Sequence, residues 1–517
     1  MTKPLLLGID IGTYSSKGVL VDGLTGETIA AHSIEHTLSM PKPGWVEHDA
    51  DRVWWREFVD ICHQVIAKAG IDPKEIQSVG ISAVGICVLP VDKEGKPLRP
   101  AILYGIDTRS TQEIAELEQK LGREKIFETG GSYLSSQAGG PKILWIKNHE
   151  PKIYEKTRYF LTSQSYLVYR LTDQAAIDIY TASGNLPLMD VHNNEWLRSA
   201  AEYIAPIECL PKMKWSCEVV GSVTAEAARE SGLAQGTPVI TGTTDAAAEG
   251  VSCGAVNCGD MMIMFGSSVF FILKTEKLIT TKHFWSASWL EPNSFALLGG
   301  MSTAGSLTRW FRDNLSPVEV AAQNAGGENA YTALEKLLSE SSPGANGLIA
   351  LPYFEGERTP LQDPMAKGLL FGLKLTHTRA DVYRALLESI GYAIRHNLET
   401  MADEGGAAKK IIGVGGGTKN LCWMQMVCDI ANIEMVIPSQ QIGASYGDAF
   451  MAGVGVGFYK SLHEIDKWVQ IKAHLYPNSE NTKIYEPYYT IFRELYRGTS
   501  QQMHKLSNLM RTVADNQ

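Results

Sequence analysis

An acidic residue ends the first apolar run of the chain, just before a polar turn. In LLLGIDIGTYSSKGVLVD (residues 5–22) the run stops at Asp10, and a second apolar run follows the turn. A glycine in such a turn lets backbone N–H groups converge on a phosphate, and hydroxyl and ammonium groups add donors. A carboxylate does not itself favour phosphate, so Asp10 would hold hydrated Mg²⁺. A plain β-hairpin with a polar turn fits the segment equally well. The candidate phosphate contacts are Gly12, Thr13, Ser15, Ser16 and Lys17.

A second acid follows an apolar run in PVITGTTDAAAEG (residues 238–250). Phosphoryl transfer to a hydroxyl group needs a carboxylate that accepts the hydroxyl proton. Asp245 is placed to do this, although an aspartate before a run of alanines also fits a simple helix N-cap. Together with the Asp10 turn, the catalytic interpretation gains weight.

The third candidate is the glycine run GVGGGTKN (residues 413–420). It fails the dinucleotide pattern GxGxxG because Thr418 stands where the third glycine should be, which argues against an oxidoreductase. A glycine-rich turn that enters a helix still suits a nucleotide, because adenine and ribose need close approach to the backbone. A tight strand–helix turn without a ligand is the alternative.

The candidate residues must be positioned by strands and helices, which are predicted to alternate along the chain. Apolar runs at residues 5–10, 17–22, 27–36 and 78–91 predict strands. Helical spacing predicts helices at residues 51–69, capped by Asp49 or Asp51, and at residues 379–401. Strands that alternate with helices indicate an α/β fold.

The hairpin plan of the N-terminus occurs a second time. GDMMIMFGSSVFFILK (residues 259–274) again reads as an apolar strand, a short Gly/Ser turn and another apolar strand. This repetition predicts two domains built on the same plan. We expect an N-terminal domain over residues 1–250, a C-terminal domain over residues 251–460, and a helical extension over residues 461–517.

Composition and charge restrict the class of protein. The 517 residues are 44% hydrophobic and 20% charged, which is typical of folded proteins, and the length suggests two large domains. The net charge of −10 argues against broad binding to nucleic acid or anionic membranes. The eight cysteines form no CxxC pattern and no zinc-type cluster, and no apolar stretch is long enough to span a membrane. A cytoplasmic protein is therefore expected.

Ordered motifs along most of the chain resemble the FGGY carbohydrate kinases of the actin-like ATPase superfamily, and most closely their xylulose-kinase-like members. The motifs that carry this resemblance are DIGTYSSK (10–17), PGWVEHDADRVWW (43–55), LRPAILYGIDTRS (98–110), PKILWIKNHEP (141–151), TGTTDAAAEG (241–250), GGMSTAGSLTRWF (299–311), GERTPLQDPMAKGLLFGL (356–373) and GGGTKNLCWMQMVCDIAN (415–432).

The resemblance implies two actin-like (ribonuclease H-like) domains that flank a catalytic cleft. The first domain would bind the sugar and carry the first phosphate loop, the second would bind the adenine of ATP, and closure would exclude water. By motif, Asp245 matches the general base, Asp10 the Mg²⁺-binding acid, and Asp107 and Arg109 a substrate-side pair. The remaining nucleotide contacts by motif are Thr13, Ser16, Lys17, Gly266, Ser267, Ser268, Gly415, Gly416, Gly417 and the nearby Asn420.

Two departures from the family pattern concern the sugar. Many xylulose kinases carry Gln-Met-His where this chain has Val84, Gly85 and Ile86, and the residue after the catalytic aspartate is Ala246 rather than Asn or Gln. Both changes remove polar groups that would bind hydroxyls, and such groups discriminate strongly between substrates. Trp45, in a PGW turn, is the aromatic residue best placed by sequence to stack on a sugar.

The leading hypothesis is an ATP-dependent sugar kinase that phosphorylates a terminal hydroxyl, with a ketopentose such as xylulose as first choice. Another polyol or a sugar acid remains an open alternative, as does a non-catalytic or ATPase-type actin-like sugar sensor. The expected partners are a small-molecule sugar and, as an open alternative, a second copy of the chain in a homodimer, without nucleic acid or membrane.

Overall fold

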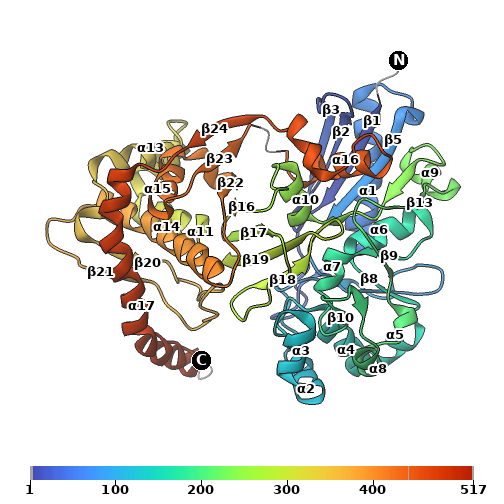
Figure 1. The fold of residues 1–517 in the computed structure, drawn as a ribbon, viewed down its shortest axis with the longest axis horizontal. Coiled ribbons are helices and arrows are strands. Elements are labelled where there is room, and N and C mark those ends of the chain that lie inside the picture. The colour runs from blue at the N-terminus through green and yellow to red at the C-terminus, as the bar shows by residue number, and fades with distance from the viewer. Residues whose placement is uncertain (1–3, 440–441, 515–517) are drawn as a thin grey trace. The chain divides into compact units, whose positions relative to one another are not determined.

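The computed structural model describes residues 4–439 and 442–514, with side chains as far as residue 510, and divides the chain into two compact units. Unit 1 comprises Met1–Cys258, Lys274–Ala296 and Ile442–Gln470, and unit 2 comprises Gly259–Leu273, Leu297–Gln441 and Ile471–Gln517. Both units are α/β structures (Figure 1). The predicted domains are continuous segments divided near residues 250 and 460, whereas each unit is assembled from three separate segments.

The sheet of unit 1 is built around the N-terminal hairpin. β1 is antiparallel to β2 and parallel to β5, and β15 (Thr243–Thr244) pairs with the end of β5. The predicted strands of the first hairpin and the next strand are confirmed. The strand order is β13 (Val219–Ser222), β14 (Pro238–Ile240), β5 (Ile76–Ala83), β1 (Leu5–Ile11), β2 (Ser15–Asp22) and β3 (Thr28–Glu35).

Helices cover both faces of this sheet. On one face, Gly18 of β2 lies against Ile61 of α1 (Arg56–Ala69), and Trp54, Phe58 and Ile61 are fully buried. Asp49 caps the turn Ala50–Trp55 that leads into α1, so the predicted helix at 51–69 is confirmed, with a π-type first turn. The other face carries α16 (Ala444–Gly455), with α10 (Asp245–Ser252) packed beside it.

Close approach of α16 to the sheet depends on two glycines. A Cβ at Gly8 would lie 1.9 Å from the carbonyl oxygen of Ser445, and one at Gly80 would lie 2.0 Å from that of Asp448. Only residues without a side chain allow this spacing. The late segment that carries α16 is thereby held against the earliest strands of the chain (Figure 1).

The rest of unit 1 contains a second apolar cluster that includes Trp145, Ile146 and Leu188. Its smaller elements are β4 (Glu47–His48), β6 (Leu89–Val91), β7 (Ala101–Ile102), α2 (Thr111–Leu121), α3 (Arg123–Gly130), α4 (Gly139–His149), α5 (Pro151–Lys156), β8 (Tyr159–Leu161), α6 (Ser163–Thr172), β9 (Ala176–Asp178), α7 (Ile179–Ser183), β10 (Met189–Asp190), β11 (Glu195–Trp196), α8 (Arg198–Ile204), β12 (Lys212–Lys214), α9 (Ala225–Ser231) and β18 (Trp285–Ser288).

Unit 2 repeats the strand plan of unit 1. The hairpin predicted at residues 259–274 is confirmed: β16 is antiparallel to β17 and parallel to β22. As in unit 1, the strand beyond the parallel neighbour is followed by an antiparallel edge strand. The order is β19 (Phe295–Met301), β17 (Val269–Thr275), β16 (Asp260–Phe265), β22 (Lys410–Val414), β23 (Met435–Pro438) and β24 (Ile471–Leu475).

The longest helices of unit 2 are α14 (Arg379–Asp403), which confirms the prediction at 379–401, and α17 (Ser479–Ala514). Its other elements are α11 (Gly305–Leu315), α12 (Pro317–Asn324), α13 (Ala330–Leu337), β20 (Ile349–Leu351), β21 (Leu369–Phe371) and α15 (Leu421–Ala431).

Two element predictions need correction. The apolar run at 78–91 is not one strand, because the chain turns at Gly85, where the N–H of Cys87 donates to its carbonyl oxygen, and it resumes as β6. The segment 461–517 is not purely helical either. It contains β24, the antiparallel edge strand of unit 2, while residues 461–470 belong to unit 1. The edge strand β24 was not predicted, because the segment 461–517 is polar and mixed in pattern over most of its length.

Candidate active site

Strand register brings Asp10 into a row with two other polar side chains of unit 1. Asp10 pairs with Lys17 across the hairpin and with Ser82 on the parallel strand β5. Directly paired residues point to the same face of a sheet. The Ser82 hydroxyl lies 3.2 Å from Asp10 Oδ1. The row Lys17–Asp10–Ser82 therefore lies across three strands, on the face that carries α10 and α16.

Asp245 begins α10 and faces this row. Burial raises the pKa of the Asp245 carboxyl to about 6, although the N–H of Ala246 donates to its Oδ1 at 2.7 Å. Glu249 follows one turn later, so both carboxylates lie on one face of the helix. Burial also raises the pKa of Glu249 to about 7, with Lys17 opposing and Asp245 adding to the shift.

The electrostatics of Asp10 favour a bound cation. Burial and the charges of Asp245 and Glu249 raise the pKa of Asp10 well above its usual value, while Ser82 and Lys17 act in the opposite direction. A divalent cation would relieve this concentration of negative charge. Within residues 4–439 and 442–510, no three His, Cys, Asp or Glu side chains are grouped as a complete metal site. The carboxylate of Asp10, surrounded by the charges of Asp245 and Glu249, fits a divalent cation.

The turn beyond Asp10 exposes some of the predicted phosphate contacts and buries one. The N–H of Gly12 donates to the carbonyl oxygen of Ser15 at 3.0 Å, while Thr13 and Ser15 are half-buried and Lys17 is exposed. Ser16 is fully buried on the opposite face, where its hydroxyl donates to Glu57 Oε2 at 2.5 Å. The Ser16 hydroxyl is therefore not directed at a ligand, contrary to the sequence-based expectation, because alternation along β2 points it at α1.

A histidine supports the turn from behind. His36 lies 2.9 Å from Glu57 Oε2 through Nδ1 and 3.2 Å from the carbonyl oxygen of Gly12 through Nε2. Glu57 thus joins His36 and Ser16 in one buried network. This network fixes the backbone of the turn without occupying its open side.

Asp107, Arg109 and Trp45, predicted on the substrate side, form a closed cluster. The side chains of Asp107 and Arg109 are 0% exposed and pair at 2.7 Å, and Arg109 also lies 2.9 Å from Glu47. The Arg109 guanidinium lies 4.1 Å from the Trp45 ring centroid, and Trp145 meets Trp45 edge-on. Because neither side chain of this pair is exposed, neither is presented to a ligand in this structure.

In unit 2, the turn Gly266–Ser268 is open to solvent. Gly266 and Ser267 are exposed and Ser268 is half-buried. The start of α11 holds this turn: the N–H of Gly305 donates to the carbonyl oxygen of Gly266 at 3.0 Å, and the N–H of Ala304 donates to that of Ser267 at 2.9 Å. The turn keeps a defined shape while its outer surface stays accessible.

The glycine run 415–417 lies against the same hairpin of unit 2. Gly415 has φ +89°, and a Cβ there would lie 2.9 Å from the carbonyl oxygen of Phe265, the last residue of β16. A Cβ at Gly416 would have no atom of the described residues within 4 Å. Asn420 caps α15 by accepting from the N–H of Trp423 at 2.8 Å. Both candidate nucleotide segments of unit 2 thus meet at Phe265.

Four residues near Asp10 and Asp245 were missed from sequence. Glu249 was detectable, since it lies four residues after Asp245 in a helical run. Ser82, Tyr104 and Asp448 carried no such signal because register and tertiary packing alone place them. The Tyr104 hydroxyl lies 3.3 Å from Thr13 Oγ1, and burial raises the Tyr104 pKa, with Asp245 contributing.

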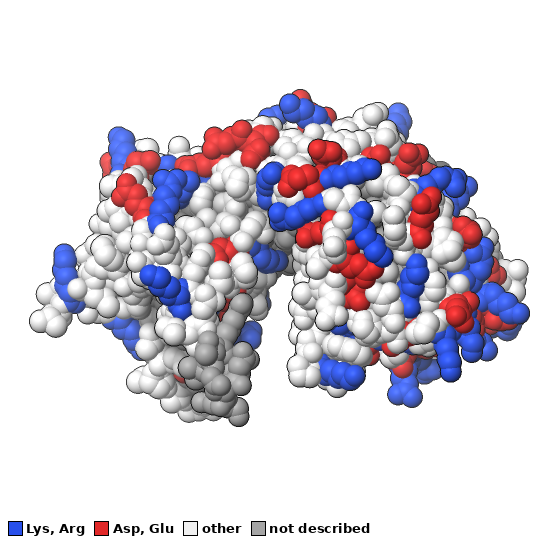
Figure 2. Space-filling view, turned by 90° about the horizontal axis from the view of Figure 1, so that it is seen from below, with Lys and Arg blue, Asp and Glu red and all other residues white. Residues whose placement is uncertain are grey.

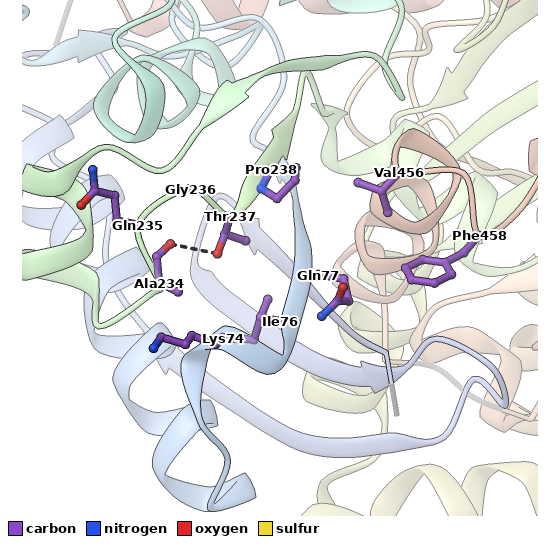
Figure 3. Close-up of a pocket in the computed structure, with 10 residues that line it drawn as sticks. All are labelled: Lys74, Ile76, Gln77, Ala234, Gln235, Gly236, Thr237, Pro238, Val456 and Phe458. Carbon is purple, nitrogen blue, oxygen red and sulfur yellow. Dashed lines mark hydrogen bonds between the residues drawn. The ribbon is translucent and has the colours of Figure 1, made fainter. Parts of the chain in front are cut away.

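A surface cavity of about 420 Å³ lies at the other end of the unit 1 strands (Figure 3). It is lined at the start of β5 by Lys74, Ile76 and Gln77, and at the end of α16 by Val456 and Phe458. Ser82 and Asp10 lie at the opposite ends of β5 and β1. The cavity is therefore separate from the carboxylate group.

Acidic and basic side chains are interspersed on the face shown in Figure 2, in keeping with a net charge that does not favour polyanions. Across the part of the chain that the structure describes, no helix is both long and apolar enough to cross a membrane.

Comparison with known proteins gives matches along nearly the whole chain. Residues 5–251 match the model of the N-terminal domain of the FGGY family of carbohydrate kinases, and residues 261–456 match that of its C-terminal domain. A xylulose kinase of Staphylococcus epidermidis is 29% identical over 510 residues, covering 97% of this chain and 98% of the relative. A glycerol kinase of Shewanella baltica is 29% identical over 492 residues, covering 92% and 96%.

The fold is also similar to solved structures. The crystal structure of xylulose kinase from Rhodospirillum rubrum superposes with a TM-score of 0.90 at 28% identity, covering 97% of this chain and all of that one.

Proposed function

Because the chain belongs to the FGGY family of carbohydrate kinases, we propose that it transfers the terminal phosphate of ATP to a hydroxyl group of a small sugar. A ketopentose such as xylulose is the first candidate acceptor. The observation that supports the proposal is the row Lys17–Asp10–Ser82 with Asp245 facing it, since these residues would supply a cation-binding acid, a phosphate-binding turn and a base within unit 1.

Asp245 would act as the general base. A sugar hydroxyl oxygen attacks the γ-phosphorus of ATP, the bond from that phosphorus to the β–γ bridging oxygen breaks, and ADP leaves. The hydroxyl proton passes to a carboxylate oxygen of Asp245. The raised pKa of Asp245 supports this role, because a base with a pKa near the working pH accepts a proton more readily than an ordinary aspartate.

Kinases of this family use ATP and a divalent metal, and we propose Mg²⁺ as the metal and Asp10 as its protein ligand. When bound, the cation supplies positive charge that stabilises the phosphate oxygens. Ser82 orients Asp10 through the hydroxyl contact at 3.2 Å, and Lys17 adds a fixed positive charge on the same face.

We propose further nucleotide contacts in each unit, considered by itself. In unit 1 the backbone of Gly12 and the side chains of Thr13, Ser15 and Lys17 are candidates, whereas Ser16 would contribute only its backbone. In unit 2 the turn Gly266–Ser268 would bind phosphate. The glycine run 415–417 would lie along adenosine, and Asn420 would hold this run in place through its cap.

The proposed sugar contacts differ from those expected from the sequence. Arg109 is paired with Asp107 and stacked on Trp45, so we assign these three residues a supporting role for the backbone around Tyr104 instead of contact with the sugar. Tyr104 is half-buried, its hydroxyl contacts Thr13, and the charge of Asp245 contributes to its raised pKa. Tyr104 is therefore a better candidate for contact with the sugar than Asp107, Arg109 or Trp45.

A second candidate acceptor is another polyol or a sugar acid. Val84 is buried, Ile86 packs against Gly139 and Gly184, and Ala246 has no polar side chain, so the hydroxyl-binding groups of many xylulose kinases are replaced by apolar ones. Such replacements alter discrimination between sugars by orders of magnitude.

The test is ADP release from ATP with a panel of pentuloses, polyols and sugar acids, for the wild type and Asp245→Asn. We expect sugar-dependent release, with kcat lowered about 100-fold or more in Asp245→Asn and nucleotide affinity retained. Near-normal turnover by this variant would remove Asp245 from its role. Hydrolysis that no sugar stimulates would favour the sugar-sensor alternative.

We further infer a cytoplasmic protein, because reduced thiols and ATP are both available there. A homodimer is also proposed, supported by exposed apolar side chains at Phe371, Leu373 and Leu375 of unit 2. Light scattering after size exclusion should then give twice the 56.7 kDa chain mass.

A further inference from the structure

A buried acid lies behind Asp10. Asp448, on α16, is 0% exposed, and its Oδ2 lies 2.7 Å from the Ser82 hydroxyl oxygen. The same Ser82 oxygen lies 3.2 Å from Asp10 Oδ1. One hydroxyl therefore links two carboxyl groups, one buried and one at the open side of the row.

A hydroxyl carries one proton and can donate to only one of these two carboxyl groups. If both acids were ionised, Ser82 would satisfy one of them and present a lone pair to the other. The arrangement is satisfied when Asp448 is neutral, donates to Ser82, and leaves the Ser82 proton for Asp10.

Two further observations agree with a neutral Asp448. Its Oδ1 is buried without a hydrogen-bond partner in the described structure, which is costly for an ionised carboxylate and much less so for a neutral acid. Burial raises the pKa of Asp448 well above its usual value; the hydrogen bonds with Ser82 oppose this shift, and the charges of Asp10 and Asp245 add to it.

Packing fixes this arrangement rigidly. Gly8 and Gly80 let the backbone of α16 lie directly on β1 and β5, so Asp448 has little freedom to move away from Ser82. Asp10 Oδ2 lies toward the turn, 3.9 Å from where a Cβ on Gly12 would be. Holding Oδ1 through Ser82 thus leaves Oδ2 available on the phosphate side.

We propose that Asp448, acting through Ser82, is a positioning residue that fixes Asp10 for binding of the divalent cation. This inference rests on the proposed function, since it assigns Asp10 to the cation. Asp448 itself touches neither the cation nor the nucleotide; it acts as an uncharged hydrogen-bond donor.

The test is a double-mutant cycle between Asp448→Ala and Ser82→Ala, read out as Mn²⁺ affinity in the presence of ADP by the electron paramagnetic resonance signal of free Mn²⁺. Loss of a residue that orients a metal ligand typically weakens metal affinity about 10–100-fold. We expect about a tenfold loss for Asp448→Ala in the wild-type background. In the Ser82→Ala background the same substitution should cost less than about twofold, because the link is already absent.

Two more variants separate the hydrogen bond from charge and from general stability. Asp448→Asn keeps the shape and can donate to Ser82, so we expect near-wild-type Mn²⁺ affinity. Ser78→Ala is the matched control: Ser78 is buried on the same strand and donates to the carbonyl oxygen of Pro238, away from Asp10, so Mn²⁺ affinity should not change. If Asp448→Ala does not fold, Asp448→Leu takes its place in the cycle.

Three outcomes would overturn the proposal. Equal losses in both backgrounds would mean that Asp448 acts independently of Ser82. A loss in Asp448→Asn as large as in Asp448→Ala would mean that its charge matters. Lower melting temperature with unchanged Mn²⁺ affinity would make Asp448 purely structural. Failure of the proposed function looks different, since the wild type itself would then not bind Mn²⁺ and ADP together or phosphorylate any sugar.

Discussion

The two hairpins share one backbone plan and differ completely in chemistry. In unit 1 the penultimate residue of β1 is Asp10, flanked in register by Lys17 and Ser82. In unit 2 the penultimate residue of β16 is Met264, flanked by Phe270 and Val414. The strand orders around the two rows are equivalent.

This difference separates what the fold provides from what the residues provide. The fold supplies an accessible Gly/Ser turn in both units, with a glycine N–H bonded back across each turn at 3.0 Å. The first row carries the ionisable side chains of Lys17 and Asp10 and the second row carries none, which is why we propose the cation and the proton transfer for unit 1.

Matched substitutions at the two penultimate positions should give the largest contrast. We expect Asp10→Asn to lower kcat/KM at least about 100-fold, because it removes the carboxylate proposed to hold the cation. Its melting temperature should hold or rise, since a crowded acid becomes neutral. Met264→Leu conserves volume and apolarity and should cost under about 1.5 kcal/mol of stability, with little kinetic change. If steady-state assays gave the same loss of kcat/KM for Asp10→Asn and Met264→Leu, the two rows would not differ in their contribution to catalysis.

Two glycines should respond in opposite ways. Gly8→Ala places a Cβ 1.9 Å from a backbone oxygen of α16 and should lower the free energy of unfolding by about 3 kcal/mol, measured in urea. Gly416→Ala meets no neighbour among the described residues, so stability should be unchanged. If adenosine lies against Gly416, the KM for ATP should rise about tenfold, or about 1.4 kcal/mol. An unchanged KM would move adenosine away from this glycine.

The pH profile should be set by unit 1. Because the pKa of Asp245 is raised to about 6, its base form is lost below that pH, and kcat/KM should fall about tenfold per pH unit there. Glu357 of unit 2 is also buried, with its pKa raised to about 7. Glu357→Gln should leave the pH at which kcat/KM falls unchanged. A shift of that pH in this variant would implicate unit 2 in proton transfer.

Glu357→Gln should show its effect in stability instead. The folded state holds the Glu357 proton to higher pH than the unfolded state, so the wild type loses stability as pH rises from 4.5 to about 7. The glutamine variant lacks this loss. Its melting temperature relative to wild type should therefore increase across that interval in calorimetric scans.

The smallest contrast is between two helix caps. Asp49 accepts from the N–H groups of Asp51 and Arg52 in unit 1, and Asn420 accepts from that of Trp423 in unit 2. Replacing either by alanine should cost about 1 kcal/mol of stability. Only Asn420→Ala should also raise the KM for ATP, because this cap adjoins the glycine run that we propose to contact adenosine. A rise in both variants would point to a general loss of folded protein.

Local patterns in the sequence predicted both hairpins, the helices at 51–69 and 379–401 and the acids Asp10 and Asp245, because strand and helix periods and turn residues are local properties. Ser82 and Asp448 reach Asp10 only through parallel pairing and through the packing of α16 on two glycines. Asp107 and Arg109, read as substrate contacts, are enclosed by Glu47 and Trp45. Which side chain faces a ligand and which faces the core depends on partners far away in sequence, and local periodicity contains no information about them.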